Sequence, residues 1–395
     1  MKKTLIALAA VAATSASFAQ VTMAGNIGFS WQQAPLRAAD GSHTQGLSIQ
    51  DGDIYVTAVE TLSEGWKATA RGGFTIRGRN NGIADRDGTV SLGTPYGVLT
   101  TGTLRSCGSI DAQKSGIVTG TYYSSNETNL YTPLDACSLV NALIFTTKVS
   151  DFTVGATYVE LNSASATTDR GNANGATGLV LNAEYANGPL KAGFDYLSLS
   201  VASNLSTGAT TTAATALLPL DGLTRLRMYG SYDMGVAKIA GGYQMRNFSL
   251  ADQYIASLTV PMGNFTFGVD YTGRQAQGRY SSGNAYTDLM VGAIAAAGYG
   301  IRNGDKASSS IGLGMNYSFS KTTTLNVSYI SYTDTGSTVV PGVDTYSTTG
   351  LSTAQAAAVP LLYASIYGTA AKGATVQQAA GNYDTEYRIR LLKSF

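Results

Sequence analysis

The stretch WKATARGGFTIR, residues 66–77, shows most clearly how this chain folds. Apolar or small residues occupy every second position from Trp66 to Ile76, and the positions between them, from Lys67 to Arg77, are mostly polar or charged. Successive side chains of a β-strand point to opposite faces, so a period of two predicts a strand. One face of this strand suits lipid and the other suits water.

The same alternation recurs at 224–232, 237–246, 265–272 and 310–319, and the charged side chains of these segments fall on one face. Aromatic residues gather near the strand ends, as the interfacial girdles of a membrane barrel require. A soluble β-sandwich would alternate too, but nothing in it would favour aromatic residues at those ends. The pattern therefore favours rows of lipid-facing and lumen-facing residues.

The composition supports many short strands, because the 395 residues include 46 Gly and 24 Tyr, and only 13% are charged. After residue 19 there is no uninterrupted apolar run of the about 18 residues that marks a spanning helix. A closed barrel is the other structure that pairs every backbone polar group inside a bilayer. The predicted fold class is an all-β transmembrane barrel.

Counting strands between short turns and long loops predicts sixteen antiparallel strands, an even number that encloses an aqueous channel. Short turns would be periplasmic and long loops extracellular. The predicted ranges are 21–33, 47–60, 65–78, 85–94, 96–105, 138–148, 151–161, 178–187, 189–199, 223–233, 236–246, 252–261, 264–273, 308–318, 323–333 and 383–395.

The N-terminus reads as a secretory signal peptide over residues 1–19, with Lys2 and Lys3, an apolar stretch from Leu5 to Ala13, and small residues ending at Ala19. The expected barrel domain is then 20–395, exported through the periplasm to the cell outer membrane. Without the two lysines, basic and acidic residues nearly balance, so bulk charge gives no argument for nucleic acid as a partner.

Several segments resemble the neisserial-type general porins of the Gram-negative outer membrane. They are the start Val21-Thr22-Met23-Ala24-Gly25-Asn26-Ile27-Gly28, the turn Glu60-Thr61-Leu62-Ser63-Glu64-Gly65-Trp66-Lys67-Ala68, and the hairpin from Arg86 to Gly102. The resemblance implies a homotrimer in outer-membrane lipid and lipopolysaccharide, assembled by the barrel-assembly machinery. Its expected function is passive diffusion of ions and small hydrophilic solutes, with no cofactor and no enzymatic step.

The C-terminus resembles the outer-membrane assembly signal, which is a terminal aromatic residue with apolar or aromatic residues at alternate places before it. The matching residues here are Tyr387, Ile389, Leu391 and Phe395.

The resemblance also implies that the third long loop, 106–137, folds into the barrel and narrows it. Rings of charged side chains are the usual selectivity device of a pore. The loop offers Asp111, Lys114, Glu127 and Asp135, and the expected wall residues are Arg71, Lys67, Arg77 and Arg105. The family places an Arg directly after the fifth-strand glycine, where this chain has Thr103. A second basic group comprises Arg225, Arg227, Lys238 and Arg246, and the preference for anions or cations stays open.

Cys107 and Cys137 bracket this loop in a chain expected in an oxidising compartment. A disulfide would close about thirty residues and stabilise the fold by about 3 kcal/mol in the chain-entropy account. Free thiols are the alternative.

The sequence also allows other functions. A substrate-specific channel could use Tyr229 and the arginines beside it, and a surface adhesin could use the Ser/Thr/Ala-rich segments 200–222 and 334–382. His43 is the single histidine and is expected in the first long loop, so a hydrolase triad or a histidine-based metal site has little to work with.

Overall fold

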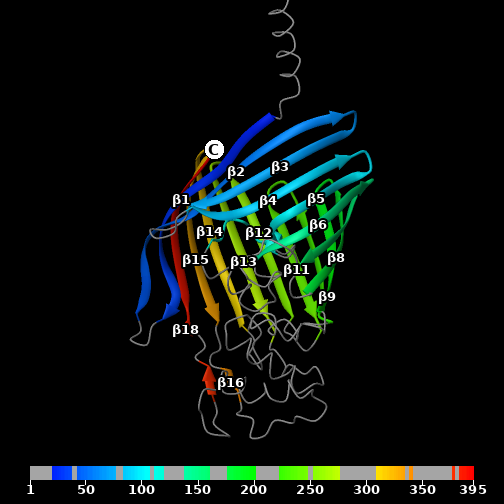
Figure 1. The fold of residues 1–395 in the computed structure, drawn as a ribbon. Coiled ribbons are helices and arrows are strands. Elements are labelled where there is room, and N and C mark those ends of the chain that lie inside the picture. The colour runs from blue at the N-terminus through cyan, green and yellow to red at the C-terminus, as the bar shows by residue number, and fades with distance from the viewer. Residues whose placement is uncertain are drawn as a thin grey trace, which may run out of the picture.

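The computed structural model shows a β-barrel (Figure 1). It describes residues 20–37, 42–76, 83–106, 111–119, 138–160, 176–201, 222–247, 252–275, 308–333, 338–340, 376–378 and 382–395. The expected signal peptide, 1–19, lies outside these residues. Among the described residues, no helix has the length and apolar character needed to span a membrane.

The first nine strands are β1 (Gln20–Arg37), β2 (His43–Ser63), β3 (Trp66–Ile76), β4 (Ile83–Thr94), β5 (Gly97–Ser106), β6 (Ser138–Val149), β7 (Phe152–Glu160), β8 (Ala176–Asn187) and β9 (Leu190–Val201). A 3-10 turn, η1 (Asp111–Gln113), lies between β5 and β6 in sequence.

The later strands are β10 (Thr224–Asp233), β11 (Lys238–Arg246), β12 (Gln253–Met262), β13 (Phe265–Arg274), β14 (Ser308–Ser320), β15 (Thr323–Thr333), β18 (Asn382–Tyr383) and β19 (Thr385–Ser394). Two short strands, β16 (Thr338–Val340) and β17 (Val376–Gln378), form a separate two-stranded sheet.

Hydrogen bonding closes the main sheet into a ring. Each strand from β1 to β15 pairs antiparallel with the next, β15 pairs with β19, and β19 pairs with β1. The described sheet has seventeen strand segments, but β18 and β19 are separated by Asp384 alone and both pair with β1. They therefore form one interrupted strand, and the prediction of a sixteen-stranded antiparallel barrel is confirmed.

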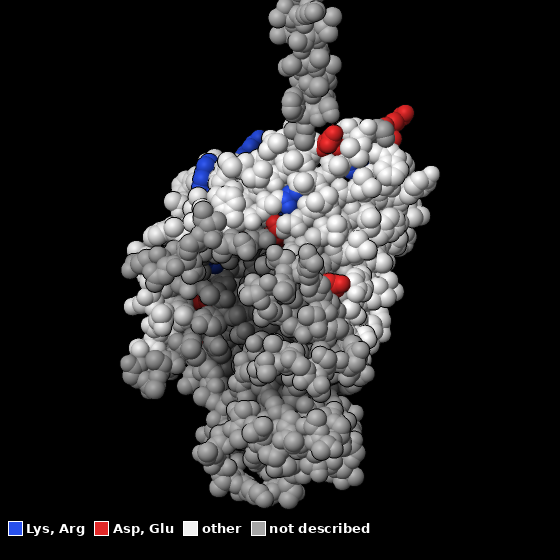
Figure 2. All heavy atoms as spheres, viewed as in Figure 1, with Lys and Arg blue, Asp and Glu red and all other residues white. Residues whose placement is uncertain are grey.

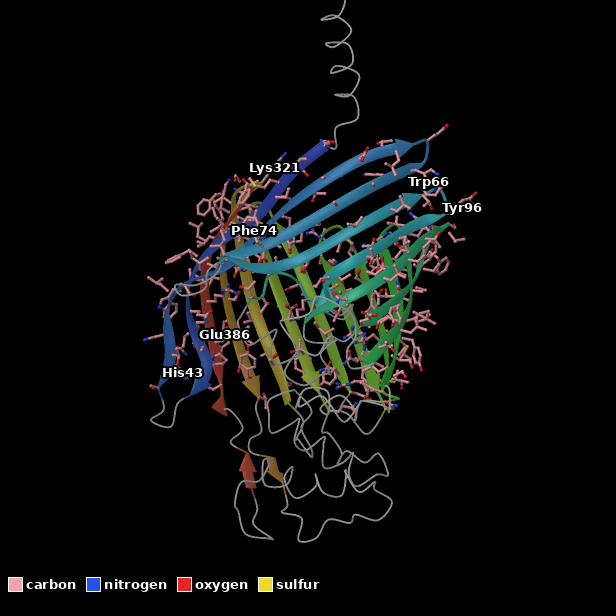
Figure 3. The ribbon with its side chains drawn as sticks, viewed as in Figure 1. His43, Trp66, Phe74, Tyr96, Lys321 and Glu386 are labelled. Atoms are coloured by element: carbon pink, nitrogen blue, oxygen red, sulfur yellow. The ribbon has the colours of Figure 1, made fainter. Side chains whose placement is uncertain are left out.

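Seven tight turns lie at one rim of the barrel. Each joins an even-numbered strand, from β2 to β14, to the strand that follows it. Gly188 and Gly263 adopt left-handed backbone conformations in two of them, with φ of 55° and 62°. The barrel ends also meet at this rim, where Gly25 N donates to Phe395 O at 3.0 Å. Figure 3 shows Trp66, Tyr96 and Lys321 at this rim and His43 toward the opposite one.

His43 was predicted in the first long loop, but it begins β2 and pairs with Arg37. Its Nδ1 lies 3.0 Å from Ala34 O, so β1 and β2 continue their pairing beyond the predicted ends at 33 and 47.

The outer face carries large apolar side chains that remain exposed, among them Leu143, Phe145, Leu181, Leu258 and Leu313. On the face seen in Figure 2, most charged atoms of the described residues lie toward the upper rim, above a broad uncharged surface. Ring pairs lie beside the tight turns, with centroids 5.1 Å apart for Phe152–Tyr185 and 4.9 Å for Phe265–Tyr317. Such an apolar band with aromatic edges suits a bilayer.

Candidate functional site: the lumen wall and the constriction loop

The loop segment 111–119 identifies the inner face of the barrel. It contacts Ser257 of β12, Asp270 of β13, and Asn326 and Ser328 of β15. Residues paired across neighbouring strands lie on the same face of a sheet. The register from strand to strand therefore shows which residues face the lumen around the ring.

Asp270 holds the middle of this segment. Its Oδ1 accepts from Ser115 N at 2.8 Å and its Oδ2 accepts from Ser115 Oγ at 2.9 Å. The Asp270 side chain is fully buried. Hydrogen bonds to an ionised acceptor are stronger than neutral ones, so this pair fixes the segment to β13.

Two further anchors lie on either side of Ser115. Thr119 donates through Oγ1 to Asn326 Oδ1 at 2.6 Å, and Thr119 N donates to Ser328 Oγ at 3.0 Å. Asn326 Nδ2 donates back to Ile117 O at 2.7 Å. At the other end, Ser257 Oγ donates to Gln113 O at 2.5 Å.

Three glycines make room for the segment. A Cβ at Gly268 would lie 2.5 Å from Ile117 Cβ, and one at Gly312 would overlap Val118 Cγ1. At Gly314 the nearest atom would be the backbone oxygen of Ile117, at 2.7 Å. Ile117 and Val118 are themselves buried against this wall. The segment therefore occupies the β12–β15 side of the lumen and leaves the opposite wall to border the passage.

On that opposite wall the register places Arg71 and Lys67 in the lumen-facing row. Arg71 pairs with Thr57 of β2 and Thr89 of β4, and its guanidinium carbon lies 3.9 Å from the centre of the Tyr55 ring. This cation–π contact holds the charge against the wall. Lys67 pairs with Gly93, close to the turn rim, and is exposed.

Arg105 lies near the end of β5, where its backbone pairs with Leu139 of β6. Of the expected loop residues, Asp111 begins η1 and Lys114 follows it, half-buried. The other expected residues lie outside the described part of the chain: Arg77, Glu127, Asp135, Cys107 and Cys137.

The four residues of the second basic group do not all lie together. Arg225 donates to Asp195 Oδ1 at 3.0 Å, and Arg227 Nε donates to Gln244 Oε1 at 2.5 Å. Arg246 pairs directly with Arg225. By contrast, Lys238 pairs with Asp233 at the turn rim, at the far end of β11, so it does not join the arginines.

An ion cluster on β19 and β2 was missed from the sequence. Arg390 donates to Asp51 Oδ2 at 3.0 Å and Arg388 donates to the same oxygen at 3.4 Å. The signal was present, because these arginines alternate with Tyr387, Ile389 and Leu391. The predicted assembly signal rests only on the outward residues of this alternation.

Comparisons with known proteins agree with this architecture. The chain matches the family described as Gram-negative porin over residues 4–293. A search of curated proteins finds no match.

Among solved structures, OmpT of Vibrio cholerae in its trimer form has a TM-score of 0.56 at 14% identity, over 96% of this chain and 100% of that one. A triple mutant of Rhodopseudomonas blastica porin has a TM-score of 0.53 at 10% identity, over 95% of this chain and 100% of that one. These likenesses show the fold. Because the family match covers well over half of the sequence, the chain belongs to the Gram-negative porin family and is an outer-membrane porin.

Proposed function

We propose that the protein is a general porin of the neisserial type, working as a homotrimer in which lumen charges select among ions and small hydrophilic solutes. The neisserial type rests on the N-terminal, turn and hairpin motifs of the sequence. Trimer formation is supported by the trimer form in which a structurally similar protein, Vibrio cholerae OmpT, was solved. No chemical step is required, so the proposal includes no enzymatic activity.

The observation that carries the proposal is a loop segment fixed inside a closed barrel, opposite a wall that carries fixed charges. Arg71 and Lys67 supply positive charge on that wall, and Asp111, Lys114, Glu127 and Asp135 are the proposed loop partners. The proposal includes a disulfide between Cys107 and Cys137 to brace the loop. Charge placed along a narrow aqueous path sets ion preference more than it sets solute size.

A planar lipid bilayer tests the proposal. Purified protein should give stepwise conductance, with closures in groups of three for a trimer of independent pores. In a salt gradient, Arg71→Glu should move the reversal potential toward cation preference, because it reverses one charge on the wall. The matched control is Lys321→Glu, in the β14–β15 turn at the rim (Figure 3). Folded protein without conductance would overturn the porin mechanism, and equal shifts from both variants would remove Arg71 from it.

A further inference from the structure

Asp51 of β2 forms ion pairs with two arginines of β19, Arg388 and Arg390. Its Oδ2 is 3.0 Å from Arg390 Nη1 and 3.4 Å from Arg388 Nη2. The arginine side chains are 12% and 7% exposed, and that of Asp51 is 25% exposed. One carboxylate oxygen is thus shared by two guanidinium groups, and the three residues together carry an excess of one positive charge.

The backbone is shaped to place Asp51 there. Gly28 of β1 pairs with Asp51, but Phe29 pairs with Ile49, so Gln50 is an extra residue in β2. Such bulges re-aim the neighbouring side chain. A Cβ at Gly28 would lie 2.5 Å from Asp51 Oδ2, so any residue other than glycine would displace the carboxylate. The cluster is therefore built by the strands and does not depend on flexible side chains alone.

The cluster borders the attachment of the constriction loop. Arg390 pairs across the sheet with Asn326, and Arg388 pairs with Ser328. These two β15 residues hold Thr119. A solute that passes the fixed end of the loop segment therefore passes the arginines on the next strand.

Along the inward row of β19, the acidic and basic side chains lie at different positions. Glu386 is the preceding inward position, fully buried, and accepts from Tyr332 Oη at 2.8 Å. The inward row thus runs from acid at Glu386 to base at Arg388 and Arg390, toward the turn rim. The positive end lies beside the loop attachment, and the planar forks of arginine suit carboxylate and phosphate oxygens.

We propose that Asp51, Arg388 and Arg390 form a charge-selective site for small anions of the carboxylate and phosphate class. The arginines attract the passing anion, and Asp51 holds both guanidinium groups against the wall and moderates their charge. This inference deepens the proposed function and rests on it.

Reversal potentials in a potassium chloride gradient test the site, together with inhibition of the chloride current by inorganic phosphate. Arg390→Gln should lower the anion-to-cation permeability ratio by about twofold, the effect of one unit charge on an ion passing about 6 Å away at physiological salt. Asp51→Asn should raise the ratio by a similar factor. Arg390→Gln should raise the phosphate concentration needed for inhibition, and Asp51→Asn should lower it.

The matched control is Lys393→Gln, on the same strand but in the outward row, where Lys393 donates to Thr322 Oγ1 at 2.7 Å. It should leave both readouts unchanged. If Arg390→Gln fails to fold, Arg390→Lys keeps the charge and should retain the reversal potential while weakening phosphate inhibition.

If the wild type conducts and both Arg390→Gln and Asp51→Asn keep its reversal potential, the anion site is overturned and the porin function stands. If Arg390→Lys has to replace Arg390→Gln, unchanged phosphate inhibition in Arg390→Lys overturns the anion site as well. A silent wild type would instead overturn the proposed function itself.

Discussion

Replacing Asp270 by alanine should release the middle of the constriction loop from the barrel wall. The carboxylate accepts two hydrogen bonds from Ser115, at 2.8 Å from N and 2.9 Å from Oγ, and it is fully buried. Hydrogen bonds to a charged group contribute about 1.5–3 kcal/mol each. Relief of the buried charge offsets part of that loss, so the attachment should weaken by about 2–4 kcal/mol.

Hydrogen exchange measures this attachment directly, because the Ser115 amide donates to Asp270. A loss of about 3 kcal/mol would speed exchange in peptides covering 111–119 by about a hundredfold, since each 1.4 kcal/mol is a factor of ten. Single-channel currents should also become noisier as the segment moves in the lumen. Asp270→Asn is the control, because its amide oxygen can still accept one of the two hydrogen bonds and should give an intermediate rate.

Unchanged exchange over 111–119 in folded Asp270→Ala protein would refute this reasoning. It would mean that the anchors at Asn326, Ser328 and Ser257 hold the segment without Asp270.

Two further substitutions test the packing and the orientation of the rows. Gly314→Ala should displace the loop backbone and change single-channel conductance, whereas Gly72→Ala, with open space around its Cβ, should leave the conductance as it is. Leu181→Lys should lower the free energy of unfolding in lipid by about 2–4 kcal/mol, because position 181 lies in the exposed outer row of β8. Asn182→Lys, one position along and facing the lumen, should cost little, and equal losses in urea titrations would contradict the assignment of the two rows.

Strand positions were predictable wherever one face meets lipid. The predicted 151–161 and 323–333 agree with β7 and β15 within one residue at each end, because their alternation persists to the turns. The predicted 47–60 falls short of β2, which runs from His43 to Ser63. At the extracellular end, β1 and β2 pair beyond the lipid-facing alternation, so periodicity gives no signal there.

The site was less predictable than the fold, for two physical reasons. Asp270 is the one acid of β13, and its partner Ser115 lies 155 residues away, so no local pattern links them. Arg105 was expected on the wall without an argument from strand parity, and the family's arginine directly after the fifth-strand glycine is Thr103 here, so a family position alone does not fix the role of a side chain.

The last strand shows why alternation can serve two purposes at once. Its outward residues Tyr387, Ile389 and Leu391 are 42%, 47% and 50% exposed, as a lipid-facing row should be. The inward residues Arg388 and Arg390 meet Asp51 across the seam where β19 closes on β1. Because the two rows share a backbone and no side-chain contacts, lumen charge can change without altering the surface that meets lipid. A strand that carries the predicted assembly signal can therefore also carry the ion selectivity of the pore.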